Sequence, residues 1–125
     1  YIYLYIYIKY NKQYKLSLRK KVMIVKVDDS NFEEVLKENK DKVVLIDFWA
    51  EWCGPCRMYG SILEDFSKEN PDVIIGKVNV DSAPESAAKY SIRSIPTTIV
   101  FKGGDVDNKL PGALSKDKLK ELVGL

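Results

Sequence analysis

The sequence predicts an α/β fold in which strands and helices alternate along one domain. Apolar runs typical of buried strands are separated by segments with helical periodicity, and a glycine pair near the C-terminal end marks a hairpin. The expected order, β-α-β-α-β-α-β-β-α, implies parallel strands joined by helices, followed by one antiparallel hairpin. A length of 125 residues, with 46% hydrophobic and 30% charged, fits one domain with a closed core.

The first strand and helix are predicted close to the N-terminal end of this domain. Residues 24–27 are apolar except for Lys26, which predicts a short strand. Ser30 and Glu33 have the spacing of a capping box, so a helix is expected over roughly 31–40. The apolar stripe of this helix is Phe32, Val35 and Leu36.

The run 43–50 is nearly unbroken in its apolar character and rich in β-branched and aromatic residues, which predicts a central strand buried on both faces. A helix follows the cysteine pair and should end near Asn70, because Pro71 cannot continue it. The predicted apolar face of that helix is Met58, Ile62, Leu63 and Phe66.

The remaining elements complete the alternating pattern. They are a strand over 73–80, a short helix over 82–90 and two further strands over 97–101 and 105–110. Gly103 and Gly104 lie between the last two strands and predict a tight hairpin. Ser115 is the expected cap of a final helix that packs through Leu119 and Leu122.

The formal net charge of +2 does not describe the folded body. Six basic residues and no acidic residue lie within 1–22, so 23–125 contain 14 basic and 18 acidic residues. A mildly acidic domain does not favour binding to nucleic acid.

The segment 1–22 begins with alternating tyrosine and aliphatic residues, and both alternating sets are apolar. It differs from a secretory signal because its basic residues follow the apolar run, and eight apolar residues are too few to span a membrane, which takes about 20. The first methionine is Met23. We therefore expect the native domain to be 23–125 and the low-complexity segment 1–22 not to belong to it, although an extra edge strand remains an alternative.

The cysteine count restricts the chemistry. Two cysteines and no histidine cannot supply a zinc site with four Cys or His ligands within one chain, and no metal is expected. Cys53 and Cys56 are separated by two residues, and no secretory signal is recognised. This spacing favours a cytoplasmic redox pair, while a static structural bridge is the alternative.

The residues around this pair fit thiol–disulfide exchange. Cys53 is predicted at a strand-to-helix junction, where unpaired N–H groups favour its anion, and it must be reachable by a protein substrate. Cys56 lies one helical turn later and can resolve a mixed disulfide. Pro55 fits the start of a helix, and Gly54 keeps the approach free of side-chain bulk. Asp47 is either a costly buried carboxylate or a solvated one at a strand end.

Four blocks in a fixed order extend this pattern over 23–125. They are Asp47-Phe48-Trp49-Ala50-Glu51-Trp52-Cys53-Gly54-Pro55-Cys56, Lys77-Val78-Asn79-Val80-Asp81, Ile92-Arg93-Ser94-Ile95-Pro96-Thr97 and Gly112-Ala113. With these blocks the chain resembles the thioredoxin family. Ser61 and Pro111 depart from it, because the family usually has proline and an aliphatic residue at these two places.

The resemblance implies a thioredoxin fold, with a central mixed sheet and helices on both faces. It also implies a cytoplasmic, monomeric protein-disulfide reductase and electron carrier in cell redox homeostasis, without a bound cofactor. Its expected partners are a thioredoxin reductase and disulfide-containing client proteins. An exported oxidant or isomerase, and a binding module without redox turnover, are the alternatives.

The resemblance also assigns roles to residues outside the cysteine pair. It implies that Asp47 is the general base for Cys56, with Lys77 as the partner of Asp47, although a solvated surface lysine is the alternative. It implies a cis bond between Ile95 and Pro96, with the Ile95 backbone offered to an extended client segment. The expected apolar rim of the site is Trp52, Trp49, Gly112 and Ala113, with Trp49 closer to the core.

Overall fold

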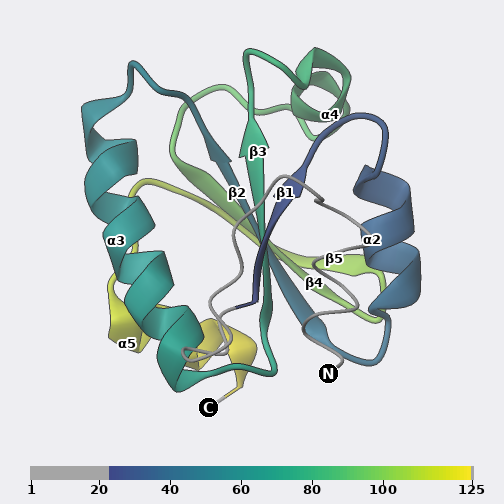
Figure 1. Cartoon of the computed structure of the whole chain (residues 1–125), viewed down its shortest axis with the longest axis vertical. Coiled ribbons are helices and arrows are strands. Elements are labelled where there is room, and N and C mark those ends of the chain that lie inside the picture. The colour runs from purple at the N-terminus through teal and green to yellow at the C-terminus, as the bar shows by residue number, and fades with distance from the viewer. Residues whose placement is uncertain (1–22, 125) are drawn as a thin grey trace.

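The computed structural model describes residues 23–124, and Figure 1 shows their arrangement. The expected boundary at Met23 and the alternative of an extra edge strand concern 1–22, which lie outside the described residues, as does Leu125. In chain order the elements are β1 (Ile24–Val27), α2 (Phe32–Glu38), β2 (Val43–Trp49), α3 (Gly54–Glu69), β3 (Ile74–Asn79), α4 (Pro84–Lys89), β4 (Thr97–Lys102), β5 (Asp105–Pro111) and α5 (Lys116–Val123). This is the predicted order.

The five strands form one mixed sheet in the order β1-β3-β2-β4-β5. β3 pairs in parallel with β1 and β2, whereas β4 is antiparallel to both β2 and β5. The prediction of a central apolar strand is confirmed, because β2 lies in the middle of the sheet with a neighbour on each side. Its carboxyl end leads directly into the cysteine pair, which is thereby placed at the end of the most enclosed strand.

Two apolar cores fill the two faces of the sheet. On one face, Ile46 and Phe48 of β2 pack with the apolar stripe of α2; on the other, Leu45 packs with residues of α3 and α5. Because side chains alternate along a strand, Asp47 points to the same face as Leu45, beneath α3. Figure 1 shows α3 and α5 on one side of the sheet and α2 on the other.

The start of α2 differs from the predicted capping box. Ser30 is not its cap, because the Ser30 hydroxyl donates to Asp28 Oδ1 at 2.6 Å. The N-cap residue is Asn31, whose side chain accepts a hydrogen bond from the Asp28 N–H at 2.8 Å and caps no helix N–H. The side chains of Ser30 and Asn31 therefore make hydrogen bonds to Asp28 in a local turn, and they do not cap the N–H groups of the helix.

The face of α3 also differs in part from the prediction. Met58 is 60% exposed, and the buried position belongs to its neighbour Tyr59. Leu63 and Phe66 are buried as predicted, and Ile62 is half-buried. The phenol of Tyr59 lies 2.6 Å from Thr98 Oγ1 on β4, so a polar contact fixes this face.

The hairpin and the final helix follow the prediction. Gly103 and Gly104 have φ values of 63° and 85°, and such a left-handed pair suits a two-residue hairpin turn. The Ser115 hydroxyl accepts a hydrogen bond from the Lys118 N–H at 3.1 Å and caps α5.

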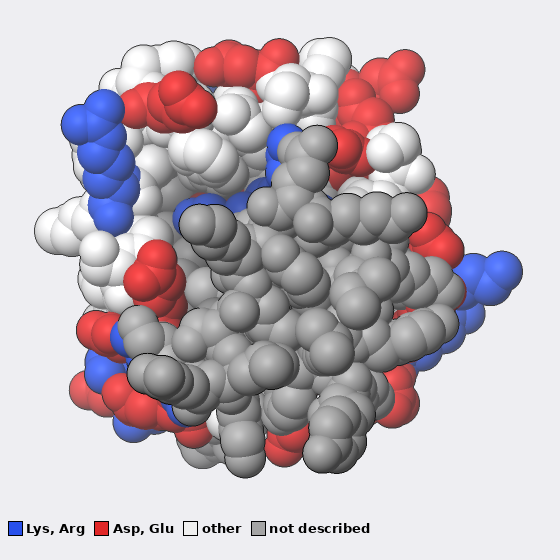
Figure 2. Space-filling view, viewed as in Figure 1, with Lys and Arg blue, Asp and Glu red and all other residues white. Residues whose placement is uncertain are grey.

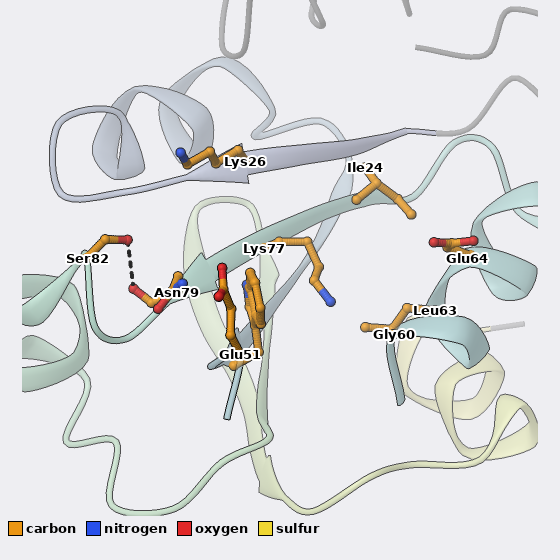
Figure 3. Close-up of a pocket in the computed structure, with 10 residues that line it drawn as sticks. Ile24, Lys26, Glu51, Gly60, Leu63, Glu64, Lys77, Asn79 and Ser82 are labelled. Carbon is orange, nitrogen blue, oxygen red and sulfur yellow. Dashed lines mark hydrogen bonds between the residues drawn. The ribbon is translucent and has the colours of Figure 1, made fainter. Parts of the chain in front are cut away.

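The surface carries both signs of charge. On the visible part of the face in Figure 2, acidic side chains are spread around the rim, and Lys and Arg are interspersed among them. A cavity of about 360 Å³ lies beside α3 and the sheet, bordered by Ile24, Gly60, Leu63 and Lys77 among others (Figure 3). Between Met23 and Gly124, no helix is long and apolar enough to cross a membrane.

Candidate active site

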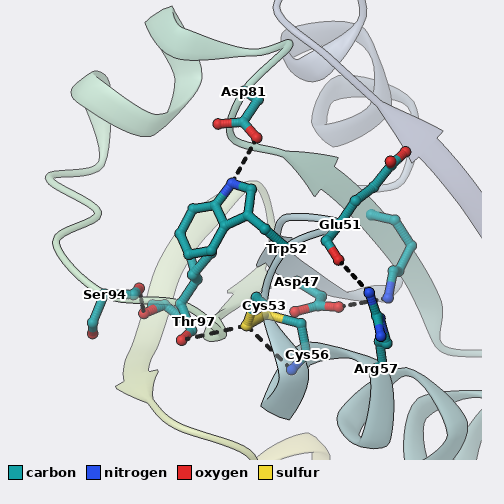
Figure 4. The surroundings of a disulfide bond; sticks show 11 residues. Asp47, Glu51, Trp52, Cys53, Cys56, Arg57, Asp81, Ser94 and Thr97 are labelled. Atoms are coloured by element: carbon teal, nitrogen blue, oxygen red, sulfur yellow. Dashed lines mark hydrogen bonds and ion pairs between the residues drawn. A yellow bond between two sulfur atoms is a disulfide. The ribbon is translucent and has the colours of Figure 1, made fainter.

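The two cysteines lie where β2 gives way to α3 (Figure 4). Cys53 is the N-cap of α3, with φ −93° and ψ 108°, and its Sγ accepts a hydrogen bond from the Cys56 N–H at 3.2 Å. Gly54 and Pro55 occupy the first turn, where the missing N–H of proline leaves no intrahelical bond unmade. A Cβ atom added to Gly54 would meet nothing within 4 Å, so the space outside this residue is open.

Cys53 and Cys56 are joined by a disulfide bond, with their Cα atoms 5.3 Å apart. The residues are 5% and 3% exposed, so both are largely covered by their neighbours in this oxidised form. The two sulfur atoms pack in a small apolar cluster with Ala50, against which Trp49 and Ile95 are packed. A molecule that exchanges disulfides with Cys53 must therefore contact the residues that surround the two sulfur atoms.

That surface includes the loop before β4. The bond between Ile95 and Pro96 is cis, as expected, and the Ile95 carbonyl oxygen lies 3.9 Å from Cys53 Sγ. The Gly112 N–H donates to the Pro96 carbonyl at 2.8 Å, which brings the segment after β5 against this loop. Gly112 has φ +90°, a left-handed conformation that favours glycine. Gly112 and the adjoining Ala113 are both exposed.

Trp52 is the most exposed large apolar side chain among the described residues, at 69%. Its indole N–H donates to Asp81 Oδ2 at 2.9 Å, which holds the ring beside the disulfide (Figure 4). A groove of about 350 Å³ runs beside this ring, and its lining includes Val80, Arg93 and Ile95. Of the predicted rim residues, Trp52 lies beside the disulfide, Gly112 contacts the loop at Pro96, and Trp49 is half-buried against the cysteine cluster.

Asp47 is buried, 1% exposed, beneath α3. Lys77 Nζ lies 2.7 Å from Asp47 Oδ2, so the implied pair exists, but the contact is an ion pair without regular hydrogen-bond geometry. Burial raises the pKa of the Asp47 carboxyl above its ordinary value, and the opposing pull of the Lys77 charge is the smaller effect. The alternative of a solvated carboxylate at a strand end is wrong.

Lys77 connects this buried carboxylate to the cavity beside α3. Its side chain is 22% exposed and borders the cavity, and Figure 3 shows it extending toward Gly60 and Leu63. The Lys77 ammonium also lies 5.4 Å from the centre of the Trp49 ring, within the range of a cation–π contact. The fully solvated alternative for Lys77 therefore does not hold.

Two polar contacts of the site were not predicted from the sequence. Tyr59 and Thr98 face each other across α3 and β4, and burial raises the pKa of Tyr59 well above its ordinary range, with the charge of Asp47 adding to the rise. Asp81 belongs to one of the four sequence blocks, and the resemblance implies no role for it. Its position was a usable signal, because Asp81 and Trp52 follow two adjacent parallel strands whose carboxyl ends meet at one edge.

A third unpredicted contact lies beside the disulfide. The Arg57 guanidinium donates from Nη2 to the Glu51 carbonyl at 3.0 Å, so a cation is held next to the first turn of α3 (Figure 4). Within 23–124, no group of three or more His, Cys, Asp or Glu side chains is placed to hold a metal ion.

The amino-acid sequence is similar to those of known proteins. A family model described as Thioredoxin matches residues 22–124. A protein named thioredoxin from Buchnera aphidicola subsp. Baizongia pistaciae is 46% identical over 103 residues, which cover 82% of this chain and 94% of that protein. Thioredoxin 2 from Chlorobaculum tepidum is 48% identical over 102 residues, covering 77% of this chain and 92% of its own length. The chain therefore belongs to the thioredoxin family of protein-disulfide oxidoreductases.

Proposed function

We propose that this chain reduces disulfide bonds in client proteins, with Cys53 as the attacking thiolate and Cys56 as the resolving thiol. The observation that carries the division of roles is the placement of Cys53 at the N-cap of α3. There its Sγ receives the Cys56 N–H, and the unpaired N–H groups of a helix start favour a negative charge on sulfur. Cys56 lies within the first turn of α3, and because its exposure of 3% is close to the 5% of Cys53, the division of roles rests on helix position and not on burial.

The reaction is a two-electron exchange between dithiol and disulfide. The Cys53 thiolate attacks one sulfur of the client disulfide, a mixed disulfide forms, and the other client sulfur leaves as a thiolate. The Cys56 thiol then loses its proton and attacks the Cys53 sulfur, which breaks the mixed disulfide and releases the second client thiolate. The product is the bond between Cys53 and Cys56 that this structure contains.

Asp47 is the proposed acceptor of the Cys56 proton. A carboxyl group whose pKa is raised by burial binds a proton more readily at neutral pH than an exposed one does, which suits a general base. The positive charge of Lys77 opposes this rise in the pKa of Asp47. Lys77 also borders the cavity beside α3, so this member of the pair is in contact with solvent.

Clients are proposed to bind on the surface around Cys53. The Ile95 carbonyl, next to Pro96, is offered to the backbone of an extended client segment, while Trp52, Gly112 and Ala113 supply a flat rim. Recognition of this kind acts mainly through main-chain hydrogen bonds and so tolerates many client sequences.

We further propose that a thioredoxin reductase returns the disulfide to the dithiol and that the chain works as a monomer in the cytoplasm. The relatives named thioredoxin support the reductase. The chain contains only the two cysteines of the redox pair, and the absence of any separate structural disulfide is typical of proteins from a reducing compartment.

The test is the reduction of insulin with dithiothreitol as the recycling reductant, followed by the turbidity of the released B chain. The wild-type chain should accelerate precipitation, and Cys53→Ser should reduce the rate to that of dithiothreitol alone. Ser61→Ala, an exposed change in the same helix, is the matched control and should retain the wild-type rate. A Cys53→Ser variant that still accelerates precipitation would contradict the assignment of the attacking sulfur.

A further inference from the structure

Lys109 lies on β5 and reaches across to the end of α4. Its Nζ donates to the Tyr90 carbonyl at 2.6 Å and to the Ser91 carbonyl at 3.1 Å. Carbonyl groups at the end of a helix have no partners within the helix, and a lysine ammonium is a suitable donor for them. A strand at the edge of the sheet thereby holds the turn that leaves α4.

This turn has an unusual residue at its centre. Ser91 has φ 53°, and it is the only residue other than glycine with a positive φ in the part of the chain that the structure describes. A left-handed conformation costs free energy for a residue with a side chain, and helices commonly place glycine at such an end. The turn therefore gains from an external contact, and Lys109 supplies one.

The turn leads directly into the loop 92–96 beside the dithiol. This loop contributes Arg93 and Ile95 to the groove next to Trp52 and carries the Ile95 carbonyl, whose oxygen lies 3.9 Å from Cys53 Sγ. Its far end is fixed, because the Pro96 carbonyl accepts the Gly112 N–H. At its near end, the Ser91 N–H donates to the Ala88 carbonyl at 3.1 Å and the Ile92 N–H to the Ala87 carbonyl at 2.9 Å, and Lys109 adds the contacts to the two carbonyls of the turn.

We propose that Lys109 is a positioning residue for client binding: its ammonium fixes the turn at Tyr90 and Ser91 and so keeps the loop 92–96 in the arrangement that receives a client polypeptide. This inference rests on the proposed role of the loop in client binding. Lys109 takes no part in the exchange of sulfur partners, which involves the cysteine pair and the client disulfide alone.

Loss of the ammonium lowers the fraction of molecules with the loop in the receiving arrangement, and the apparent affinity for a client falls with that fraction. Because both contacts are exposed, the effect is modest, and a rise in KM for a protein client of roughly three- to fivefold is expected from Lys109→Met. The kcat value for the client should stay unchanged. A small aromatic disulfide does not need the loop, so its rate of reduction should also be unchanged.

The experiment compares Lys109→Met, Lys109→Arg and Lys102→Met with the wild-type chain. KM and kcat are measured for insulin, together with the rate constant for 5,5′-dithiobis(2-nitrobenzoic acid). Lys109→Arg should restore most of the affinity, because its guanidinium can donate to the same carbonyls. Lys102 is a matched control, since it lies at the opposite end of β4 from the loop and pairs with Asp107 at 3.4 Å.

A second pair of variants tests the turn itself. In a Ser91→Gly background the turn adopts its left-handed conformation without strain, so Lys109→Met should raise KM by less than it does in the wild-type chain. Equal effects in the two backgrounds would overturn the proposed mechanism. An unchanged insulin KM in Lys109→Met, or an equal rise in Lys102→Met, would also overturn it.

Failure of this inference can be told apart from failure of the proposed client surface. Trp52→Ala removes a rim residue and should raise the insulin KM whatever Lys109 does. If Trp52→Ala raises KM and Lys109→Met does not, only the role of Lys109 is wrong. If neither variant changes KM, the client surface is wrong as well, and the inference falls with it.

Discussion

Replacement of Asp47 by alanine should change the pH dependence of stability in a defined direction. The folded-state pKa of this buried carboxyl is raised, so over the interval above the unfolded value of about 3.9 the folded chain holds a proton that the unfolded chain has lost. The free energy of unfolding contributed by this group is therefore fully present below that value. It is lost as the pH rises toward the folded pKa.

The magnitude of the slope follows from proton linkage. One proton of difference between the two states changes the free energy of unfolding by about 1.4 kcal/mol per pH unit, which is the upper limit for this carboxyl between its two pKa values. Removal of the carboxylate also leaves a small space beneath α3, which costs on the order of 1 kcal/mol. Asp47→Ala should therefore be less stable than wild type at the acid end and more stable at neutral pH.

The assay is urea unfolding of wild type and Asp47→Ala at intervals from about pH 3 to 9, which includes the unfolded pKa of about 3.9, plotted as the difference between the two chains. The difference is the useful quantity because other carboxyl groups titrate equally in both. Asp47→Asn is the matched control, since it removes the charge and leaves no space. A variant that is less stable than wild type at every pH, or a difference that does not change with pH, would refute the reasoning.

The same variant should slow the resolution of the mixed disulfide, because Cys56 then lacks a base. Single-turnover reduction of insulin by the prereduced chain measures this step. Wild-type rates with the wild-type pH profile would show that Asp47 is not the base, whatever its effect on stability.

Two further predictions concern stability. Hydrogen bonds from the Ser86 hydroxyl, the Ser86 N–H and the Glu85 N–H lower the pKa of Asp29. Asp29→Asn should therefore destabilise the chain at pH 7, and the difference in stability from wild type should shrink as the pH falls below about 4. Urea unfolding midpoints at pH 7 and below pH 4 test this. In this structure the Met23 backbone nitrogen donates to Ser67 Oγ at 3.1 Å, and a chain that begins at Met23 keeps this donor. Such a chain should match the full chain in stability and in insulin reduction. A loss above about 1 kcal/mol would show that 1–22 support the fold.

The sequence predicted the element order well because each element has a strong local signal. The apolar run of β2, the glycine pair of the hairpin and the capping serine of α5 all act within a few residues, and the structure has each of them. The capping box of α2 failed for an equally local reason. Asp28 and Ser30 form a competing turn, and the spacing of Ser30 and Glu33 does not reveal which partner the serine takes.

The site was predictable only where residue type carries the chemistry or a family resemblance supplies the role. The dithiol follows from residue type and spacing, whereas the pairing of Asp47 with Lys77 needed the resemblance because it joins two strands far apart in the chain. The hydrogen bonds from Lys109 Nζ to the carbonyls of Tyr90 and Ser91 depend on how the lysine side chain is placed in the folded chain. No periodicity or motif in the sequence points to them.

The most direct test of the proposed roles is the capture of a client by a chain that lacks the resolving thiol. Cys56→Ser, prereduced and mixed with insulin, should accumulate a mixed disulfide through Cys53 that mass spectrometry locates and added dithiothreitol releases. Cys53→Ser under the same conditions should form little adduct, because its remaining thiol lies within α3 and not at the N-cap position, where the helix start favours a thiolate. Equal adduct formation by the two variants, or an adduct through Cys56 alone, would contradict the assignment of Cys53 as the attacking sulfur.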